Sequence, residues 1–247
     1  MAPPQWQKGT VVDIIQETWN TRRYFIRVED SEKFDFVAGQ FVTLDLPIGE
    51  RPAQRWRSYS IANNPGDTNV IELLVALLEG GAGTTYLFNE VKVGSQLSLR
   101  GPHGFFTLPE TLDTDLFLIC TGAGLAPFRS MIQDVSQTQK PHQNIYLIYG
   151  CRTQRDLLYY DELSRLDAEM EKFNFIPTLS REQWDGRTGY VHPVYEEICD
   201  TKASQSGDAP KPALFYLCGW KFMINDAYKN LTDRGYDKKS IKFELYG

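Results

Sequence analysis

The segment RWRSYS, residues 55–60, places two arginines, a tryptophan and a tyrosine around two serines. It lies between a Pro-Ala-Gln segment and the stretch IANNPGD, which is typical of a turn. A guanidinium group binds phosphate through two parallel hydrogen bonds, and an aromatic ring stacks on a flat ligand. The segment therefore admits two interpretations, an amphipathic edge strand or a site for an anionic, aromatic ligand.

A second candidate site is TGAGLAPF, residues 121–128, between an apolar run and an expected helix. Glycines let backbone amides approach an anion, and the helix N-terminus adds positive partial charge. Proline suits the first helical turn, where no N–H donor is needed. A plain tight turn is the alternative, because the motif is a weak signal by itself, but a parallel sheet behind it favours a ligand site. The candidate residues are Thr121, Gly122, Gly124 and Pro127.

Arginines gather after the next expected strands. Arg152 follows the strand ending IYGC, where dinucleotide-binding folds usually have an acidic residue for the ribose. Ser180, Arg181 and Arg187 lie in LSREQWDGRTGY, after the third strand. Any one of these arginines is compatible with a solvated surface charge. Three at one sheet edge suit a 2′-phosphate, so the pattern predicts NADP rather than NAD.

Two halves of the chain must position these residues. Short β-branched or aromatic stretches, split by Gly, Pro and Asn, predict an antiparallel barrel or sandwich with one short helix near 84–91. The expected strands are 9–18, 24–30, 40–47, 57–63, 70–78 and 95–102. After residue 110, strands alternate with helices, which predicts a parallel α/β sheet. Its expected strands are 116–124, 144–150, 174–180 and 213–219. Its expected helices are 126–137, 157–173 and 221–235. The segment 202–212 is expected to be a polar loop.

Bulk properties exclude several classes of protein. The chain has 247 residues, a net charge of −6 and an ordinary 42% of hydrophobic residues, so a large core needs no disulfide or metal. The negative charge disfavours a nucleic-acid binder. The four cysteines have no CxxC spacing, which disfavours zinc and iron–sulfur ligation, and we expect no metal. Two of the cysteines end apolar runs, which predicts buried, reduced thiols and therefore a reducing compartment. We find neither a signal peptide nor an apolar run of membrane length, so we expect a cytoplasmic protein.

The chain is similar to the ferredoxin–NADP reductase family across nearly its whole length. The resemblance is carried by RSYS, GGAGTTYL, GPHGFF, CTGAGLAPFRSM, YGCR, LYYDEL, SREQ, YLCG and the terminal ELYG, in that order. It implies an FAD-binding antiparallel β-barrel domain over residues 1–110 and a nicotinamide-binding α/β domain over 111–247. The change of pattern near residue 110 agrees with that division.

The resemblance assigns roles in the first half. Arg57 would bind the FAD pyrophosphate, Tyr59 would lie against the isoalloxazine, and the Ser60 hydroxyl would reach flavin N5. In GGAGTTYL, Gly81 would let the chain approach the pyrophosphate and Thr84 would donate to it. Arg55 lies outside the motif, and a solvated or acceptor-facing charge is its simplest role.

The resemblance also assigns roles near the C-terminus. Cys218 would lie beside the reacting carbon of the nicotinamide, and Gly219 would leave room for the ring. Glu244 would relay protons or hold the nicotinamide amide, and Tyr246 would cover the isoalloxazine. The chain departs from the plant pattern by one further residue, Gly247. Asp161 and Glu162 are adjacent on an expected helix and face different directions, so they form no paired-carboxylate site.

The family resemblance implies hydride transfer between NADP(H) and flavin N5, with one-electron exchange to a separate ferredoxin or flavodoxin. We expect a monomer or weak dimer with a local basic patch, for which the candidates are Arg22, Arg23, Arg51, Arg55, Lys238, Lys239 and Lys242. One alternative is the NAD(P)H-dependent reductase component of an oxygenase, or a general flavin or dye reductase. Another is an electron-transfer or redox-sensing flavin subunit without nicotinamide turnover.

Overall fold

The computed structural model describes residues 5–29, 31–205 and 210–246. Three sequence expectations fall partly outside this range: the end of the second strand at Asp30, the centre of the polar loop at 206–209, and Gly247. The chain divides into two compact units, and each is described by itself. The first comprises Met1–Leu108 with Ala126–Gln137, and the second comprises Pro109–Leu125 with Thr138–Gly247.

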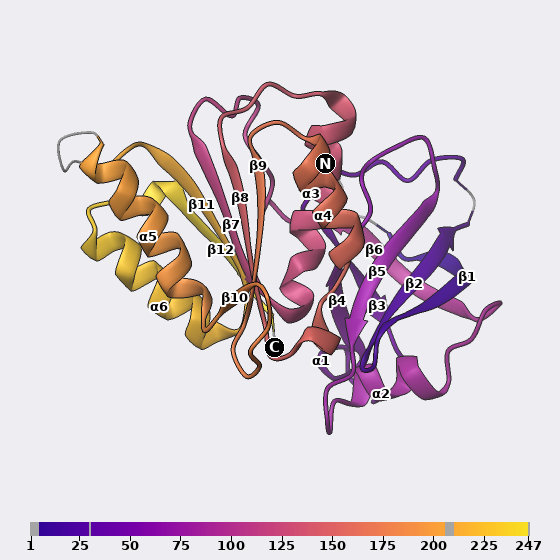
Figure 1. Ribbon diagram of the computed structural model, residues 1–247. Helices are drawn as coiled ribbons and strands as arrows, with labels where there is room; N and C mark the ends of the chain where they lie inside the picture. The colour runs from indigo at the N-terminus through magenta and orange to yellow at the C-terminus, as the bar shows by residue number, and fades with distance from the viewer. Residues whose placement is uncertain (1–4, 30, 206–209, 247) are drawn as a thin grey trace. The chain divides into compact units, whose positions relative to one another are not determined.

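The first unit is built on six antiparallel strands in the order β4-β3-β6-β1-β2-β5 (Figure 1). They are β1 (Gln7–Thr18), β2 (Thr21–Val28), β3 (Phe41–Asp45), β4 (Trp56–Ser60), β5 (Val70–Ala76) and β6 (Gln96–His103), with short helices α1 (Pro52–Arg55) and α2 (Ala82–Asn89) between strands. The chain just after β4 meets β5 through an Ile61–Leu73 bridge and an Ala62 N–H bond to the Glu72 carbonyl, 2.8 Å long. The two outer strands are thereby joined, and the sheet closes as a barrel.

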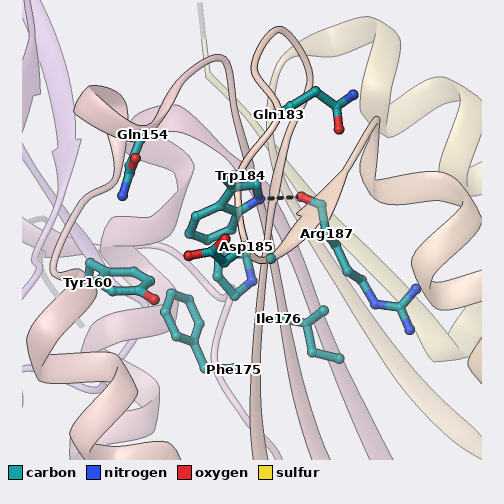
Figure 2. A pocket seen from close by; sticks show the side chains of 10 residues that line it. Gln154, Tyr160, Phe175, Ile176, Gln183, Trp184, Asp185 and Arg187 are labelled. Atoms are coloured by element: carbon teal, nitrogen blue, oxygen red, sulfur yellow. Dashed lines mark hydrogen bonds between the residues drawn. The ribbon is translucent and has the colours of Figure 1, made fainter.

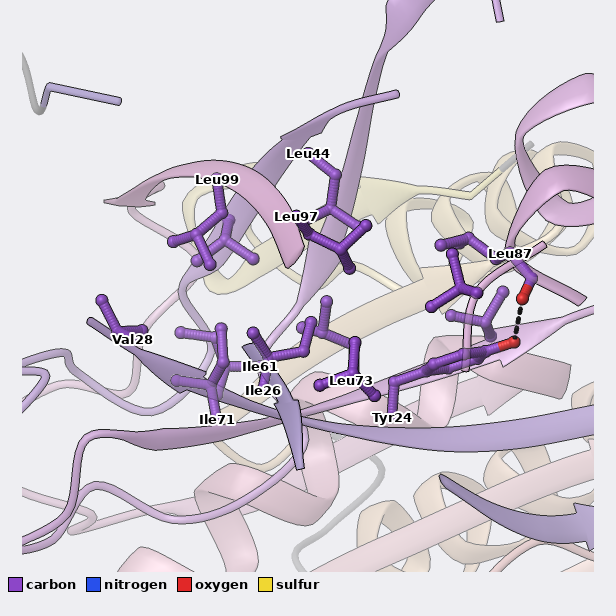
Figure 3. Close-up of a cluster of buried hydrophobic side chains, with 14 of the residues drawn as sticks. Tyr24, Ile26, Val28, Leu44, Ile61, Ile71, Leu73, Leu87, Leu97 and Leu99 are labelled. Atoms are coloured by element: carbon purple, nitrogen blue, oxygen red, sulfur yellow. Dashed lines mark hydrogen bonds between the residues drawn. The ribbon is translucent and has the colours of Figure 1, made fainter. Parts of the chain in front are cut away.

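The barrel core follows from the alternation of side chains along each strand. Tyr24, Ile26 and Val28 of β2 point inward and are at most 1% exposed. They pack among leucines and isoleucines from the other strands (Figure 3). The Tyr24 hydroxyl donates to the Leu87 carbonyl at 2.8 Å, which ties α2 to the core. This bond holds α2 in place, and the first turn of α2 forms part of the candidate site described below.

Helix α3 (Leu125–Thr138) packs with the first unit through a buried ion pair. Ile71 and Leu73 point into the barrel, so Glu72 between them points outward, yet it is only 2% exposed. Its carboxylate accepts from Arg129 Nη1 of α3 at 2.9 Å and from Arg23 Nε at 2.6 Å. Arg129 also donates to the Ala62 carbonyl at 2.9 Å. The helix is therefore anchored by charge as well as by apolar packing.

The second unit is a six-stranded parallel sheet in the order β10-β9-β8-β7-β11-β12 (Figure 1). Its strands are β7 (Asp115–Thr121), β8 (Ile145–Cys151), β9 (Phe173–Leu179), β10 (Arg187–Thr188), β11 (Ala213–Gly219) and β12 (Ile241–Leu245). Helices α5 (Val191–Ser204) and α6 (Lys221–Asp233) bury Val194, Tyr195, Ala227 and Leu231 against the central strands. Helix α4 (Tyr160–Glu169) follows β8 and contacts β9. Single 3-10 turns lie at Gly122–Gly124, Gln154–Asp156 and Lys238–Ser240.

The expected barrel and parallel sheet are confirmed, with differences in detail. Helices α1 and α5, the two-residue strand β10 and strand β12 are additions, and α5 takes Lys202–Ser204 from the expected polar loop. Helix α4 is shorter than the expected 157–173 because Tyr159 has a positive φ of 50° before it and Met170 is extended after it. Helix α6 ends close to Gly235, whose φ of 87° suits a residue without a side chain.

Candidate functional site

Strand β4 presents Arg57 and Tyr59 on the inner face of the first unit. Tyr59 pairs with Val42 and Arg57 with Leu44, both core residues of β3. Directly paired residues of antiparallel strands share a face, so the two side chains point towards the barrel interior at its edge. Their neighbour Ser60 points to the opposite face, where it is 3% exposed. The Arg-x-Tyr-Ser motif thus supplies groups to two faces of one strand.

Arg57 lies against the first turn of α2. A Cβ atom on Gly83 would come within 2.9 Å of Arg57 Cγ and 3.2 Å of its Nε. The glycine is therefore required for the arginine to cross the helix at this point. The N-cap residue, Gly81, makes no side-chain capping bond. A guanidinium group beside the N–H groups of a helix start is an arrangement suited to a phosphate group.

Gly81 and Thr84 also shape the turn before α2. The Thr84 hydroxyl accepts from the Leu78 N–H at 3.1 Å and lies 3.1 Å from the Gly81 carbonyl, to which it donates. A Cβ on Gly81 would meet that hydroxyl at 2.8 Å. Both residues therefore hold the turn closed. The predicted donation from Thr84 to a pyrophosphate requires its hydroxyl to leave the Gly81 carbonyl.

The electrostatic setting keeps Tyr59 neutral. Burial raises the pKa of Tyr59 to about 12, although the nearby Arg57 charge opposes the shift. The phenol therefore stays protonated near neutral pH and offers an uncharged ring to a ligand.

Arg55, expected to be a solvated or acceptor-facing charge, is instead held in an ion pair. Its Nε and Nη2 atoms donate to the two carboxylate oxygens of Asp45 at 2.7 and 2.8 Å. Three other candidates for a basic patch are also engaged: Arg22 Nη1 donates to the Phe88 carbonyl at 2.8 Å, Arg23 binds Glu72, and Lys242 Nζ lies 2.8 Å from the Tyr216 hydroxyl.

In the second unit, the glycine-rich turn after β7 meets the end of β11. A Cβ on Gly124 would lie 2.5 Å from the Cys218 carbonyl oxygen. A Cβ on Gly219 would lie 2.5 Å from the Thr121 hydroxyl, and the φ of Gly219 is 128°. The Trp220 N–H donates to the Thr121 hydroxyl at 3.2 Å. Neither glycine tolerates a side chain, because the two backbones approach one another this closely.

Gly122 differs from these two glycines. Its φ is 54°, it is exposed, and nothing lies within 4 Å of a Cβ built on it. The chain is therefore open to a ligand at this residue. Pro127 lies in the first turn of α3, as expected from the sequence.

Cys218 is fully buried between two neighbouring strands. It pairs in register with Cys120 of β7 and with Glu244 of β12. Burial raises the pKa of the Cys218 thiol well above its usual range, and the Glu244 charge raises it further. A thiol in this state is uncharged and unreactive as a nucleophile. After β12, the Tyr246 N–H donates to the Gly219 carbonyl at 3.0 Å, so the terminal segment is fixed beside the strand end.

The predicted arginines gather at the carboxyl ends of β8 and β9. The Arg181 N–H donates to the Arg152 carbonyl at 2.9 Å, and the Ser180 hydroxyl donates to the Cys151 carbonyl at 3.2 Å. Arg187 begins β10, directly opposite Thr178 of β9. All three guanidinium side chains are exposed. We name Arg152, Arg181 and Arg187 the arginine edge.

One member of the arginine edge already has a carboxylate partner. Arg187 Nη1 and Nη2 donate to the two oxygens of Glu197, on α5, at 2.7 and 3.3 Å. This contact lowers the pKa of Glu197 and raises that of Arg187.

A pocket of about 630 Å³ adjoins the same edge. Tyr160 lies with its ring centroid 6.1 Å from those of Phe175 and Trp184 (Figure 2). The Trp184 indole N–H donates to the Arg187 carbonyl at 2.6 Å. Figure 2 shows the Arg187 guanidinium pointing away from these three rings. The pocket offers an aromatic platform suited to a planar ligand.

Sequence reasoning missed the Gly83 contact, the Glu197 pair and the aromatic pocket. Gly83 had a signal, since it lies in the quoted GGAGTTYL motif. Glu197 carried no signal of its own that would pair it with Arg187, and it lies in a segment for which no helix was expected.

Within the described residues, no group of three or more His, Cys, Asp or Glu side chains is arranged to hold a metal ion. In that same part of the chain, no helix has both the length and the apolar character needed to cross a membrane.

Two family models match this chain. The oxidoreductase FAD-binding domain matches residues 8–108, and the oxidoreductase NAD-binding domain matches residues 118–229. The Arg57–Gly83 contact lies in the first match, and the Thr121–Gly124 turn, the Cys218–Gly219 strand end and the arginine edge lie in the second.

Similar proteins agree with the two models. Ferredoxin–NADP reductase B of Sorangium cellulosum is 35% identical over 221 residues, covering 88% of each chain. The phenol hydroxylase P5 protein of Acinetobacter pittii is 31% identical over 90% of this chain, which spans 60% of that relative. Among solved structures, an Amycolatopsis cytochrome P450 reductase has a TM-score of 0.83 at 26% identity, covering 99% of this chain and 71% of that chain. A Neisseria gonorrhoeae ferredoxin NADP+ reductase has a TM-score of 0.78 at 24% identity, covering 97% and 98%. The chain therefore belongs to the ferredoxin–NADP reductase family of FAD- and NAD-binding oxidoreductases.

Proposed function

We propose that this protein is an FAD-dependent reductase that moves electrons between NADP(H) and a separate one-electron carrier, a ferredoxin or a flavodoxin. The observation that carries the proposal is the open turn after β7, at the carboxyl edge of the parallel sheet, where Gly122 is exposed and nothing lies within 4 Å of a Cβ built on it. Parallel sheets bind nucleotides at such an edge. The proposed division of labour gives residues 1–110 to FAD and residues 111–247 to the nicotinamide nucleotide.

Residues of the first unit fit FAD. Arg57 and the amides at the start of α2 would hold the pyrophosphate, because Gly83 gives the arginine its place there. Tyr59 would offer its neutral ring to the isoalloxazine, and Ser60 would donate to N5. When bound, the flavin accepts two electrons from a reduced nicotinamide and releases them singly.

Residues of the second unit fit a pyridine nucleotide. Gly122 and Gly124 would let the backbone approach its phosphates, and Gly219 would leave room for the nicotinamide. Cys218 would present a small neutral thiol to the ring, since its pKa is raised far above neutrality. Glu244, paired in register with Cys218, would hold the amide group or a proton. Tyr246 would cover the isoalloxazine.

The preference for NADPH is proposed from the arginine edge. A 2′-phosphate can accept two hydrogen bonds at once from the planar fork of a guanidinium group. The 2′-hydroxyl group of the NADH ribose carries no charge and cannot do so. Ser180 lies beside Arg181, and its hydroxyl would have to leave the Cys151 carbonyl to donate to the phosphate. The aromatic pocket of Tyr160, Phe175 and Trp184 would take the adenine end of the same molecule.

The first test is anaerobic stopped-flow reduction of the FAD-loaded protein by NADPH and NADH in parallel. Fast flavin bleaching by NADPH and slow bleaching by NADH support the proposal. Equal rates would remove the NADPH preference, and no bleaching by either would favour a flavin subunit without nicotinamide turnover.

The double substitution Arg181→Ala/Arg187→Ala tests the same assignment within the protein. We expect a loss of about 10- to 100-fold in kcat/KM for NADPH, the size of one or two charge-assisted hydrogen bonds, and little change for NADH. Equal losses for both nucleotides would contradict the 2′-phosphate role.

A second candidate is the reductase component of an oxygenase. It is favoured by similarity to the Acinetobacter pittii phenol hydroxylase P5 protein and to the anthranilate 1,2-dioxygenase electron transfer component of Acinetobacter baylyi, which is 31% identical over 91% of this chain. This chain spans only 61% of the latter. Electron transfer to a purified ferredoxin, compared with an oxygenase iron–sulfur protein, separates the two candidates.

We propose a cytoplasmic location and a monomer or weak dimer. All four cysteines are free thiols, which suits a reducing compartment.

A further inference from the structure

We propose that Glu197 restrains the preference for NADPH by competing with the 2′-phosphate for the guanidinium group of Arg187. This inference rests on the proposed function, because it concerns the nucleotide used in that reaction. It makes Glu197 a positioning residue that acts through Arg187.

The contact between the two side chains uses the donors that a phosphate would need. Arg187 places Nη1 and Nη2 on the two oxygens of Glu197, which is the same fork-to-fork geometry that guanidinium groups use on phosphates. A phosphate that approaches the guanidinium from this same end can therefore take both donors only after the carboxylate releases them. The guanidinium also points away from the aromatic pocket (Figure 2).

The other two members of the arginine edge are not restrained in this way. Within the described part of the chain, neither Arg152 nor Arg181 forms an ion pair with a carboxylate. Only Arg187 has to exchange one anion for another when a 2′-phosphate arrives. NADH has a hydroxyl group at that position, so its binding does not require the exchange.

The pair is weak enough to be exchanged. The side chains of Arg187 and Glu197 are 46% and 59% exposed, so water screens their attraction. A phosphate dianion is a stronger acceptor than a carboxylate and displaces it. The apparent affinity for the phosphorylated ligand is the intrinsic affinity multiplied by the fraction of time for which Arg187 is free of Glu197. Glu197 therefore reduces NADPH binding without preventing it.

The experiment is isothermal titration calorimetry, which measures the dissociation constants of 2′,5′-ADP and 5′-AMP for the Glu197→Gln variant and the wild type. The two ligands differ only in the 2′-phosphate. Glutamine keeps the size and an oxygen acceptor but removes the charge. We expect 2′,5′-ADP to bind about 3- to 10-fold more tightly, as expected for freeing an exposed pair, and 5′-AMP to bind as before. In kinetics, KM for NADPH should fall while kcat stays the same. Unchanged 2′,5′-ADP affinity would overturn the proposal.

Two controls decide whether the gain comes through Arg187. In an Arg187→Ala background, Glu197→Gln should give no gain in 2′,5′-ADP affinity. Glu182→Gln removes the same charge beside Arg181, from a side chain that accepts the Gln154 N–H at 2.7 Å, and should also give no gain. An equal gain from Glu182→Gln would indicate a general effect of net charge and would overturn the proposal.

The outcomes separate this inference from the proposed function. If Arg187→Ala weakens 2′,5′-ADP binding and Glu197→Gln does not strengthen it, the competition is refuted and the 2′-phosphate role of Arg187 stands. If Arg187→Ala leaves 2′,5′-ADP binding unchanged, the role of Arg187 in the proposed function is refuted as well.

Discussion

Each unit of the molecule contains an arginine–glutamate pair, and the two pairs differ in burial. Arg129 and Glu72 are 6% and 3% exposed, whereas Arg187 and Glu197 are 46% and 59% exposed. The donor atoms and the distances are similar, at 2.9 and 2.7 Å. Because the geometry is similar, the difference in solvent access determines the role of each arginine–glutamate pair. A buried pair holds elements together because neither charge can exchange its protein partners for water, whereas an exposed pair is available for exchange with a ligand.

The largest expected effect comes from breaking the buried pair. Glu72→Gln removes the buried negative charge that faces Arg129 and Arg23, and we expect the free energy of unfolding to fall by about 3–5 kcal/mol. Urea unfolding followed by circular dichroism measures this loss. A much smaller loss would mean that water reaches the pair and that the contrast with Arg187–Glu197 fails.

A double substitution sharpens the same comparison. Glu72→Leu/Arg129→Met removes both charges and fills the space with apolar side chains, so it should cost less stability than Glu72→Gln alone. A larger cost would show that the uncompensated charge of Arg129 is not the source of the loss in Glu72→Gln, and the contrast with the exposed pair would fail.

The intermediate effect concerns Arg57, which is partly buried and lies beside Gly83. Arg57→Ala should weaken FAD binding by about 10- to 100-fold, the value of one or two hydrogen bonds to a charged group. Fluorescence titration of the apoprotein with FAD measures the change. Arg55→Ala is the matched control, because Arg55 is occupied by Asp45 and should leave FAD affinity unchanged. Equal losses from both variants would contradict the pyrophosphate assignment of Arg57.

The sequence predicted best what is encoded over short distances. Alternating strands, the Thr121–Gly124 turn and the Pro127 helix start are local patterns, and each was found. Helix α5 was missed although its signal was present: Val191, Val194, Tyr195 and Ile198 follow helical spacing, with Pro193 in the first turn. Because α5 was missed, Glu197 had no predicted place beside Arg187.

Contacts between distant segments could not be read from the sequence in the same way. Glu72 and Arg129 are 57 residues apart, and the sequence around either residue does not indicate that the other is its partner. A partial signal existed, since a single glutamate in the apolar run VIELLVALL requires a partner if the strand is buried. The contact of Gly83 with Arg57 likewise depends on how α2 lies across β4, which local patterns do not specify.

The smallest expected effect is that of the exposed pair on stability. Glu197→Gln should leave the melting temperature unchanged, because the exposed carboxylate gains little by binding Arg187 in water. Arg187 lowers the pKa of Glu197, so what the pair contributes is present at neutral pH and is lost as the pH falls through that lowered pKa. The melting temperatures of variant and wild type, measured at pH 7 and again in acid, should therefore differ little at either pH. A clear loss at pH 7 that disappears in acid would show that the pair supports the fold as the buried one does. Arg187 would then resist exchange, and the similarity between the two pairs would extend from geometry to function.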